Sequence, residues 1–473
     1  MGNSVIKISN LKKTLRYLKK NGFKNAYYAA MERIERENAS DYHYRMPDEQ
    51  ELERQRKEAE KFPYMFSILV PAYETNPSYL REMADSVLNQ TYSKLELIIA
   101  DASSSETVKK VIETYDDKRI RYIRIPENKG ISANTNAALS KAEGEYIGLM
   151  DHDDILTPDA LYEMAIAIGE SEKSGNTAWM LYSDEDKGNK DCTAYYEPHF
   201  KQELNVDLLL SNNYVCHFLV MKRGLIKSLK LRPEYDGAQD FDLVLRAVGR
   251  LLYETKEQRK DLMREWESAG RASVVHVPKV LYHWRCHTGS TAENPESKRY
   301  AYDAGRCAVE DFIKNRGWNG RVEDTRHLGF YRINYESDIF VQRPEVGVVG
   351  GKILNARKKI AGGIYDEEGT PLYEGLRPEY SGYMHRASLL QEAYAVDVRC
   401  MKIRNELRKM FEETFGVPYE EEGITGYFAY EKLKNFMKEA ELKEKSMDFC
   451  KKVRAEGYTI VYTPDVAVRW TDS

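Results

Sequence analysis

The stretch "GEYIGLMDHDDILTPDAL", residues 144–161, joins a short apolar run to three acids that surround a histidine. The run "YIGLM" is typical of a buried β-strand, and Asp151, Asp153 and Asp154 follow directly at its end. Carboxylates this close repel one another, so either one of them takes up a proton or a cation lies among them. The stretch therefore predicts a buried strand that ends in a ligand site.

The composition is that of a globular protein, and it argues against some classes of function. The chain has 473 residues, enough for two to four domains, with 42% hydrophobic and 31% charged residues. A net charge of −5 gives no reason to expect nucleic acid as a partner. The six cysteines form no CxxC pair, which argues against a zinc site and a disulfide framework and favours a reducing cytoplasm.

The first 62 residues are expected to form a basic and charged helical region. Residues 4–31 contain seven Lys or Arg and no acid, with apolar residues at helical spacing. Such a helix either packs on the domain behind it or contacts an anionic membrane face, where each basic residue adds ~1 kcal/mol. The chain has neither an apolar run of ~18–20 residues nor an apolar signal core, so we expect no membrane span and no export.

Strand-like and helical segments alternate from residue 66 onward. The strand-like runs are 66–73, 95–101, 121–125 and 146–150, and the helical runs between them are 77–90, 106–115 and 132–142. This alternation predicts a parallel sheet covered by helices, in which ligands bind outside the carboxyl ends of the strands. Polar clusters stand at all four strand ends: 71–74, Asp101, 128–130 and 151–154. We expect them to converge on one rim.

In this order the motifs resemble a known family. "VPAYE", "IIADASSS", "PENKGISANTNAAL" and "YIGLMDHDD" look like the nucleotide-binding half of family 2 glycosyltransferases of the GT-A fold. "YSDEDK" (182–187), "PHFKQELNVDLLLSNNYVCHFLVMKR" (198–223), "YDGAQDFDLVLR" (235–246) and "HVPKVLYHWRCHTGSTA" (276–292) look like the acceptor half. The most similar group is the bacterial enzymes that build rhamnan, O-antigen and other cell-surface polysaccharides. The resemblance implies a Rossmann-like, mainly parallel sheet covered by helices in a catalytic domain at 63–320.

The resemblance also implies which residues bind the donor. The nucleoside side would be formed by Pro71, Ala72, Tyr73, Glu74 and Asp101, and the diphosphate side by Asn128, Gly130 and Asn134.

The same resemblance implies the residues at the reacting centre. Asp151 and Asp153 would be the metal-binding acids of a DxD motif: Asp153 would ligate Mn²⁺ or Mg²⁺, and Asp151 would reach the ribose or metal-bound water. His287 would add a metal ligand from a closing loop, and Asp240 would be the general base. The chemistry agrees, because a departing diphosphate needs a hard cation and an attacking hydroxyl needs a carboxylate to take its proton.

Several residues near these motifs admit two interpretations. His287 is either a ligand or a loop histidine bonded to backbone, whereas His283 is expected to be packed. The acids at 184–186 form either a solvated turn or part of the acceptor or metal region. Asp242 would face away from Asp240 on a helix.

Position 239 departs from the family pattern. Relatives often carry two acids in a row there, and this chain has Gln239 before Asp240. The neutral side chain removes one carboxylate repulsion, so Asp240 is expected to be more acidic than in an acidic pair.

The last third of the chain weakly resembles the acceptor half of the same family. "VGVVGGKIL" (346–354) and the stretch 447–470 carry it, but the nucleotide half is missing. Lys445 and Ser446 stand where two acids are expected, and Trp470 stands near where relatives carry a histidine. We expect residues 321–473 to be a degenerate domain that docks on the first, shapes an acceptor groove or makes a dimer contact.

The leading interpretation is an inverting, metal-dependent glycosyltransferase. It would move a sugar from a UDP- or dTDP-sugar to a hydroxyl of a surface or lipid-linked glycan, in the cytoplasm at the inner membrane face. A peripheral membrane contact through residues 4–31 and a homodimer stay open. One alternative is a catalytically dead glycan-binding or scaffold protein. The presence of Asp151, Asp153 and Asp240 argues against this alternative. The other is a sugar nucleotidyltransferase, whose Gly-rich, basic loop after the first strand is missing from "PAYETNPS".

Overall fold

The computed structural model describes residues 17–19, 22–32, 42–254, 270–287, 299–422, 427–428, 433 and 437–470. The chain forms two compact units. Residues 42–204 and 212–317 make one of them, here called the α/β unit. Residues 318–473, the segment 205–211 and the chain before residue 42 make the other, here called the C-terminal unit. The domain bounds expected from the sequence stay a prediction, since compactness does not test independent folding.

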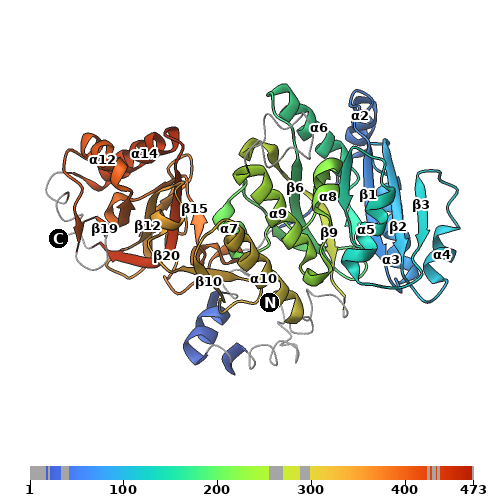
Figure 1. Ribbon diagram of the computed structural model, residues 1–473, viewed down its shortest axis with the longest axis horizontal. Helices are drawn as coiled ribbons and strands as arrows, with labels where there is room; N and C mark the ends of the chain where they lie inside the picture. The colour runs from blue at the N-terminus through green and yellow to red at the C-terminus, as the bar shows by residue number, and fades with distance from the viewer. Residues whose placement is uncertain are drawn as a thin grey trace, which may run out of the picture. The chain divides into compact units, whose positions relative to one another are not determined.

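The first half of the α/β unit is the parallel sheet that the sequence predicts. Its strands are β1 (Phe66–Ala72), β2 (Leu95–Asp101), β3 (Ile120–Arg124) and β4 (Tyr146–Leu149). They lie in the order β3-β2-β1-β4, and each neighbouring pair is parallel (Figure 1). The expected α/β fold is therefore confirmed, and the carboxyl ends of these strands share one edge.

The second half extends the same sheet in mixed directions. Its strands are β5 (Ile155–Leu156), β6 (Met180–Gly188), β7 (Tyr195–His199), β8 (Leu219–Lys222) and β9 (Val274–Arg285). Strand β8 runs antiparallel between β4 and β6, and β9 runs parallel to β6. The short β5 pairs antiparallel with β9, and this pairing brings the chain after the acid cluster against the end of β9.

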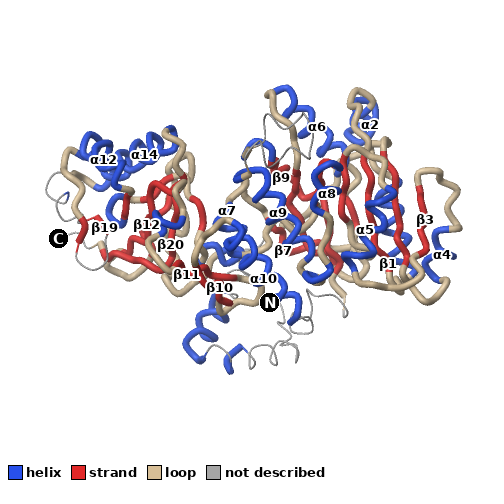
Figure 2. Tube along the Cα trace, viewed as in Figure 1, coloured by secondary structure: helices blue, strands red, loops and turns tan. Residues whose placement is uncertain are grey.

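Helices cover both faces of this sheet (Figure 2). They are α2 (Glu49–Ala59), α3 (Pro77–Leu88), α4 (Thr107–Ile112), α5 (Ile131–Lys141), α6 (Ala160–Lys173), α8 (Arg223–Leu229), α9 (Gln239–Tyr253) and α10 (Arg299–Asn315). Phe66, Ile68 and Val70 of β1 share one buried cluster with apolar residues of α3 and α6. Because successive strand residues point to opposite faces, the alternate positions face α5, which lies against β1 and β2.

The C-terminal unit is a smaller α/β body. Its main sheet contains β12 (Val346–Leu354), β13 (Ile360–Gly362), β15 (Gln391–Glu392), β17 (Met401–Ile403) and β20 (Thr459–Arg469). Its other strands are β10 (Gly320–Asp324), β11 (Tyr331–Tyr335), β14 (Ile364–Tyr365), β16 (Ala395–Val396), β18 (Glu421–Glu422) and β19 (Tyr427–Phe428). Its helices include α7 (Val206–Ser211), α11 (Ile339–Gln342), α12 (Arg408–Phe415) and α14 (Glu439–Ala455).

Strand pairing in the C-terminal unit repeats that of the acceptor side of the α/β unit. Strand β6 pairs antiparallel with β8 and parallel with β9, and Met180 lies opposite Met221 and Val274. Strand β12 likewise pairs antiparallel with β17 and parallel with β20, with Val348 opposite Ile403 and Ile460. In each unit a long helix, α9 or α14, precedes the last of these strands.

The polar side chains at the repeated place in the C-terminal unit bind the unit's own backbone or one another. The Ser446 hydroxyl accepts from the Val398 amide and donates to a carbonyl of its own helix. The buried Arg399 guanidinium binds Asp397 and lies 4.9 Å from the Trp470 ring centre. This place is therefore filled by internal ion pairs.

Helix α7 contributes an acid to the C-terminal unit from far along the sequence. Asp207 is fully buried and forms an ion pair with Arg343, which is buried as well and lies over the Trp318 ring. Asn205 exchanges hydrogen bonds with the backbone of Glu392 at 2.9 and 2.8 Å. The sequence did not indicate that residues 205–211 would leave the acceptor half in this way.

The N-terminal segment is described only in part. Residues 22–32 are helical, with Phe23 77% and Tyr27 52% exposed. Tyr28 packs edge-on against Tyr380, and the Glu32 carboxylate accepts from the Ser381 amide at 3.1 Å. Residues 4–16 and 20–21 of the expected basic helix lie outside the described residues, so the membrane contact stays a prediction. Within the described part of the chain, no helix combines the length and apolarity that crossing a bilayer requires.

Replacing Asp207 with Ala should strongly destabilise the C-terminal unit, because it leaves the buried Arg343 with only the more exposed Glu345 as an ion partner. We expect a loss of ~3–5 kcal/mol in the free energy of unfolding, measured by urea denaturation of the full chain. Asp465→Ala removes the half-exposed pair with Arg332 and is the matched control, expected to cost at most ~1 kcal/mol. Equal costs for the two variants would contradict this account of the buried pair.

Candidate active site

The loops after β1 and β2 are joined by hydrogen bonds. The Glu74 amide donates to the Ser103 hydroxyl at 2.8 Å, and the Glu74 carboxylate accepts from the Ser104 amide and the Ser105 hydroxyl at 2.7 Å each. The hydroxyl and amides of this serine run hold the pKa of Glu74 below its usual range. Tyr73 is half exposed beside this loop. Two of the polar clusters expected at the rim are thus brought together.

Asp101 is fully buried at the end of β2. Its carboxylate accepts from the Tyr122 hydroxyl at 2.7 Å, from Arg124 at 2.9 Å and from the Ser103 amide at 2.9 Å. The Ala102 amide donates to the Ala72 carbonyl at 2.9 Å, which fixes the end of β1 beside it. Asp101 therefore organises the rim, and its direct contact with a base or ribose stays a prediction.

A tight turn leads into α5. The Asn128 side-chain oxygen accepts from the Gly130 amide at 3.1 Å and from the Asn134 side chain at 3.0 Å. Gly130 has φ +96°, and an added Cβ would lie 2.0 Å from a carboxylate oxygen of Asp236. Asp236 in turn accepts from the Ser132 amide at 3.1 Å. Only glycine fits this approach, and Asn134 keeps its buried Oδ1 without a hydrogen-bond partner among the described residues.

The three acids after β4 have three different environments. Asp154 is buried and accepts from the Tyr282 hydroxyl at 2.6 Å and from the Arg285 amide at 2.8 Å. Burial, together with the nearby Asp153 and Asp151, raises the pKa of Asp154 well above its usual value. Asp154 is therefore held inside the α/β unit by Tyr282 and the Arg285 amide, unlike the two more accessible acids.

Asp153 meets His287, as the family resemblance implies. The His287 Nε2 lies 2.9 Å from the Asp153 carboxylate, and their side chains are 23% and 21% exposed. Both line a cavity of about 630 Å³, together with Tyr79 and Lys190. Two of the three predicted metal ligands, Asp153 and His287, stand far apart in the sequence but lie side by side at an open cavity.

Arg285 holds the backbone next to the Asp153–His287 pair in place through hydrogen bonds. Its side chain is fully buried and donates to the Asp153 carbonyl at 2.5 Å, to the Lys190 carbonyl at 2.7 Å and to the Glu82 carboxylate at 2.7 Å. Its guanidinium also lies 4.5 Å from the Tyr79 ring centre. The backbone of the acid cluster is therefore held by the strand that leads to His287.

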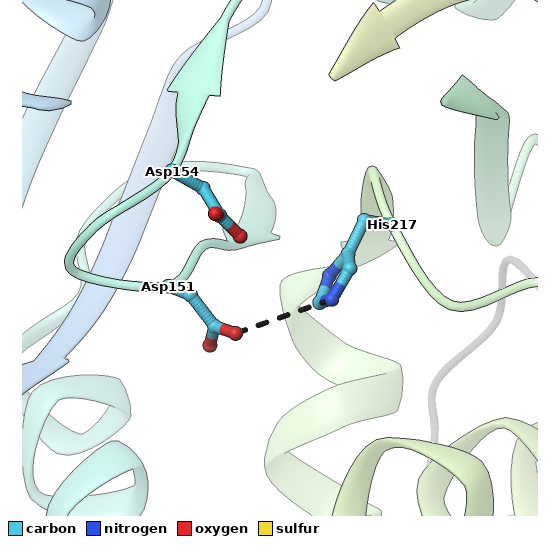
Figure 3. Close-up of side chains that lie close together, drawn as sticks. All are labelled: Asp151, Asp154 and His217. Atoms are coloured by element: carbon cyan, nitrogen blue, oxygen red, sulfur yellow. Dashed lines mark ion pairs between the residues drawn. The ribbon is translucent and has the colours of Figure 1, made fainter. Parts of the chain in front are cut away.

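His217, just before β8, joins the cluster from a third direction. Its Nε2 lies 4.0 Å from the Asp151 carboxylate (Figure 3). Its ring also stacks on Tyr282, with the ring centres 4.6 Å apart. Candidate ligand atoms of Asp151, Asp154 and His217 all lie within 4.8 Å of one another. Because Asp154 already accepts two hydrogen bonds, Asp153 with His287 is the better arrangement for a cation. The sequence motif "YVCHFLVMKR" contains His217, and its place directly before a buried strand was the available signal.

Asp240 lies in the first turn of α9 and accepts from the Asn213 side chain at 2.8 Å. Burial raises the pKa of Asp240, and the nearby His217 and the Asn213 hydrogen bond oppose that rise. Gln239 turns to the backbone and accepts from the Gly237 amide at 2.8 Å. Asp240 is thus a single carboxylate with an elevated proton affinity.

Asp242 faces elsewhere, as expected from its helical position. It is buried and paired with Arg246 at 2.7 Å and with Arg232. It therefore belongs to the packing of α9 and not to the site.

The interpretation of residues 184–186 as a solvated turn is wrong. All three acids lie in β6 and are buried. Asp184 binds His276 at 2.8 Å, and Asp186 binds His283 at 2.5 Å. The packed position expected of His283 is confirmed, and its ring also stacks on Tyr195 at 3.9 Å. These contacts depend on the register between β6 and β9, which a local pattern does not reveal.

Comparison with known proteins finds a family match within the α/β unit and several more distant likenesses. Residues 67–230 match the family described as glycosyl transferase family 2. An uncharacterized protein, y4gI, of Sinorhizobium fredii is 35% identical over 53% of this chain and 25% of its own length. The O-antigen biosynthesis protein RfbC of Myxococcus xanthus is 28% identical over 57% of this chain and 20% of its own length. The chain therefore spans a quarter or less of these two relatives.

Solved structures also show likenesses. S. aureus TarS 1–349 is 19% identical over 53% of this chain and 66% of its own, with a TM-score of 0.38. The mannosyltransferase PcManGT of Pyrobaculum calidifontis is 16% identical over 57% of this chain and 82% of its own, with a TM-score of 0.34.

Residues 67–230 are therefore similar to family 2 glycosyltransferases, the family that the sequence motifs resemble.

Proposed function

We propose that the protein is an inverting, metal-dependent glycosyltransferase that moves a sugar from a nucleoside-diphosphate sugar to a glycan hydroxyl. The observation that carries this proposal is the Asp153–His287 pair at a cavity of about 630 Å³. Asp240 lies close enough to Asp151 and His217 for both to affect its pKa. A cation site and a candidate base thus belong to one centre.

The residues present fit a divalent cation of the Mn²⁺ or Mg²⁺ kind. Carboxylate oxygens from Asp153 and Asp151 and an imidazole nitrogen from His287 are suitable donors, and all three side chains are partly accessible. Such a cation, when bound, would offset the negative charge that develops on the departing diphosphate. It would also remove the repulsion between the two acids.

The rim residues would hold the nucleotide. The Gly130 backbone lies at the start of α5, and the buried, unpartnered Asn134 Oδ1 beside it can accept from a hydroxyl of the nucleotide but not from a phosphate oxygen. The loop 71–74 borders the end of β1, where Tyr73 offers an exposed ring for stacking against a base. We assign the nucleoside to the β1–β2 side and the diphosphate to the side of α5 and the acids.

Asp240 would take the proton of the attacking hydroxyl. A carboxylate with a raised pKa is a stronger base than an exposed one, provided that it is ionised at the working pH. Direct attack on the face opposite the departing diphosphate inverts the anomeric centre. The acceptor is proposed to be a surface or lipid-linked glycan, supported by the names of relatives such as the O-antigen biosynthesis protein and chondroitin synthase of Escherichia coli. Work at the inner membrane face belongs to the same proposal.

Wild-type protein should release a nucleoside diphosphate from at least one donor in a panel of UDP-, dTDP- and GDP-sugars with Mn²⁺. Asp240→Asn should lower that transfer by ~10²–10⁴-fold while UDP binding, measured by calorimetry, stays unchanged. The exposed Asp116→Asn is the control and should keep the wild-type rate. Near wild-type transfer by Asp240→Asn would show that another group is the base. Release of pyrophosphate would favour the nucleotidyltransferase alternative, and turnover of none of the donors would favour the scaffold alternative.

The pH profile should report the Asp240–Asn213 contact. Transfer needs the Asp240 carboxylate, so the rate falls as the pH drops through its pKa. Asn213 donates to the charged form, and removing it in Asn213→Ala should raise the pKa of Asp240 further. The acid limb of kcat/KM should therefore move to higher pH, whereas Asn405→Ala, on the surface of the C-terminal unit, should leave it in place. A limb that stays or moves to lower pH contradicts the assignment.

Two histidines allow the cation's position to be tested. With UDP present, His287→Ala should weaken Mn²⁺ binding by at least ~10-fold, measured by electron paramagnetic resonance titration. His217→Ala should leave the Mn²⁺ affinity within about threefold, because the Asp153–His287 pair is intact. The reverse order of effects would place the ion among Asp151, Asp154 and His217 instead.

A further inference from the structure

A buried ion pair lies behind the loop that carries His217. The Lys201 side chain is fully buried, and its ammonium lies 3.6 Å from the Glu185 carboxylate. Burial alone would raise the pKa of Glu185, but Lys201 and His199 hold that pKa at about 2. Glu185 and Lys201 therefore form an ion pair inside the α/β unit.

Both charged groups bind the backbone of the same short loop, residues 213–217. The Lys201 ammonium donates to the Val215 carbonyl at 2.7 Å and to the His217 carbonyl. The Glu185 carboxylate accepts from the His217 amide at 3.2 Å. The loop is thus held from both sides of residue 216 by one cation and one anion.

The two ends of this loop reach the two halves of the reaction centre. Asn213 donates to the Asp240 carboxylate at 2.8 Å and accepts from the Cys216 amide at 3.3 Å. His217 stacks on Tyr282 and faces Asp151 at 4.0 Å. The position of the loop therefore sets the candidate base and the first acid of the DxD motif together.

The orientation of Glu185 sets it apart from its neighbours in β6. Asp184 and Asp186 bind histidines of β9, whereas Glu185 points to the opposite side of the strand and binds the loop. A buried ion pair gives little net stability in general, since desolvation offsets the attraction. Glu185 also contacts His199 Nδ1 of β7 at 3.4 Å, but the backbone contacts of both Lys201 Nζ and the Glu185 carboxylate go to one loop beside the site. That concentration of contacts is better explained by positioning of the loop than by stability.

We propose that Lys201 and Glu185 are positioning residues that fix loop 213–217, and through it Asp240 and His217, in the geometry that transfer needs. This inference rests on the proposed function. Neither Asp153, His287 nor the β1–β2 rim is held by the pair, so the pair should affect the transfer step and spare nucleotide binding.

Lys201→Met, which keeps the length and removes the charge, tests the proposal in the full chain. We expect kcat to fall by ~10–100-fold with the best donor of the panel, because small displacements of a reacting group cost that much. The KM for that donor and the Kd for UDP with Mn²⁺ should stay within about threefold. In an Asn213→Ala/His217→Ala background, Lys201→Met should cost less than about threefold more, because its route to the site is already removed.

A matched control separates positioning from general stability. Arg343→Met also removes a buried cation from an ion pair, but in the C-terminal unit. Rates of both variants are divided by the folded fraction from thermal unfolding. If the kcat of Lys201→Met falls no more than that of Arg343→Met, or if its effect is undiminished in the double-mutant background, the proposal is overturned.

Glu185→Gln, which keeps an acceptor for the His217 amide, provides a second variant should Lys201→Met not fold. It should lower kcat by ~10-fold, and an unchanged kcat overturns the proposal.

Hydrogen exchange tests whether Lys201 and Glu185 hold loop 213–217 and does not require a measurement of transfer activity. This holding of the loop by the pair is called the clamp here. Lys201→Met should speed amide exchange at Cys216 and His217, while Arg343→Met should not. Unchanged exchange in Lys201→Met shows that the pair does not hold the loop and overturns the proposal. A wild-type protein that turns over no donor overturns the proposed function instead, and the exchange data still decide whether the clamp exists.

Discussion

The repulsion among three carboxylates at the end of β4 is the constraint on which the rest of the site depends. The three acids have different surroundings that offset this repulsion. Asp154 is buried, takes hydrogen bonds from Tyr282 and Arg285, and has a raised pKa. Asp153 meets an imidazole, and Asp151 faces His217 across 4.0 Å. Asp154 is thus held by protein hydrogen bonds, and the two more accessible acids are the ones proposed to hold a cation.

This arrangement is built by strands distant in sequence. The antiparallel pairing of Ile155 with His283 and of Leu156 with Tyr282 places the end of β9 beside the acid cluster. That register alone brings the Tyr282 hydroxyl, the Arg285 guanidinium and His287 to the acids. Behind them, the buried acids of β6 secure β9 on one side and loop 213–217 on the other. The site is thus a product of sheet register as much as of its motifs.

The sequence predicted the features that depend only on neighbouring residues: the first four strands, the helices between them and the polar residues at the strand ends. Alternating periodicity identified β1 to β4 and the helices between them, and the rule for strand ends placed Glu74, Asp101 and Asp153 at one rim. The sequence could not show that Asp154 and residues 184–186 are buried, or that His217 joins the cluster, because those facts depend on pairings of distant strands. The transfer of residues 205–211 to the C-terminal unit was invisible for the same reason, since it rests on the pairing of Asp207 with Arg343.

The central claim is that the acids of the DxD motif and a histidine from beyond β9 gather around one divalent ion. Anomalous diffraction from crystals grown with UDP and Mn²⁺ tests it most directly. The account predicts a manganese peak bonded to the Asp153 carboxylate and the His287 Nε2, with the diphosphate oxygens completing its coordination. A nucleotide bound without manganese at Asp153, or a peak held by Asp154 and His217, would contradict it.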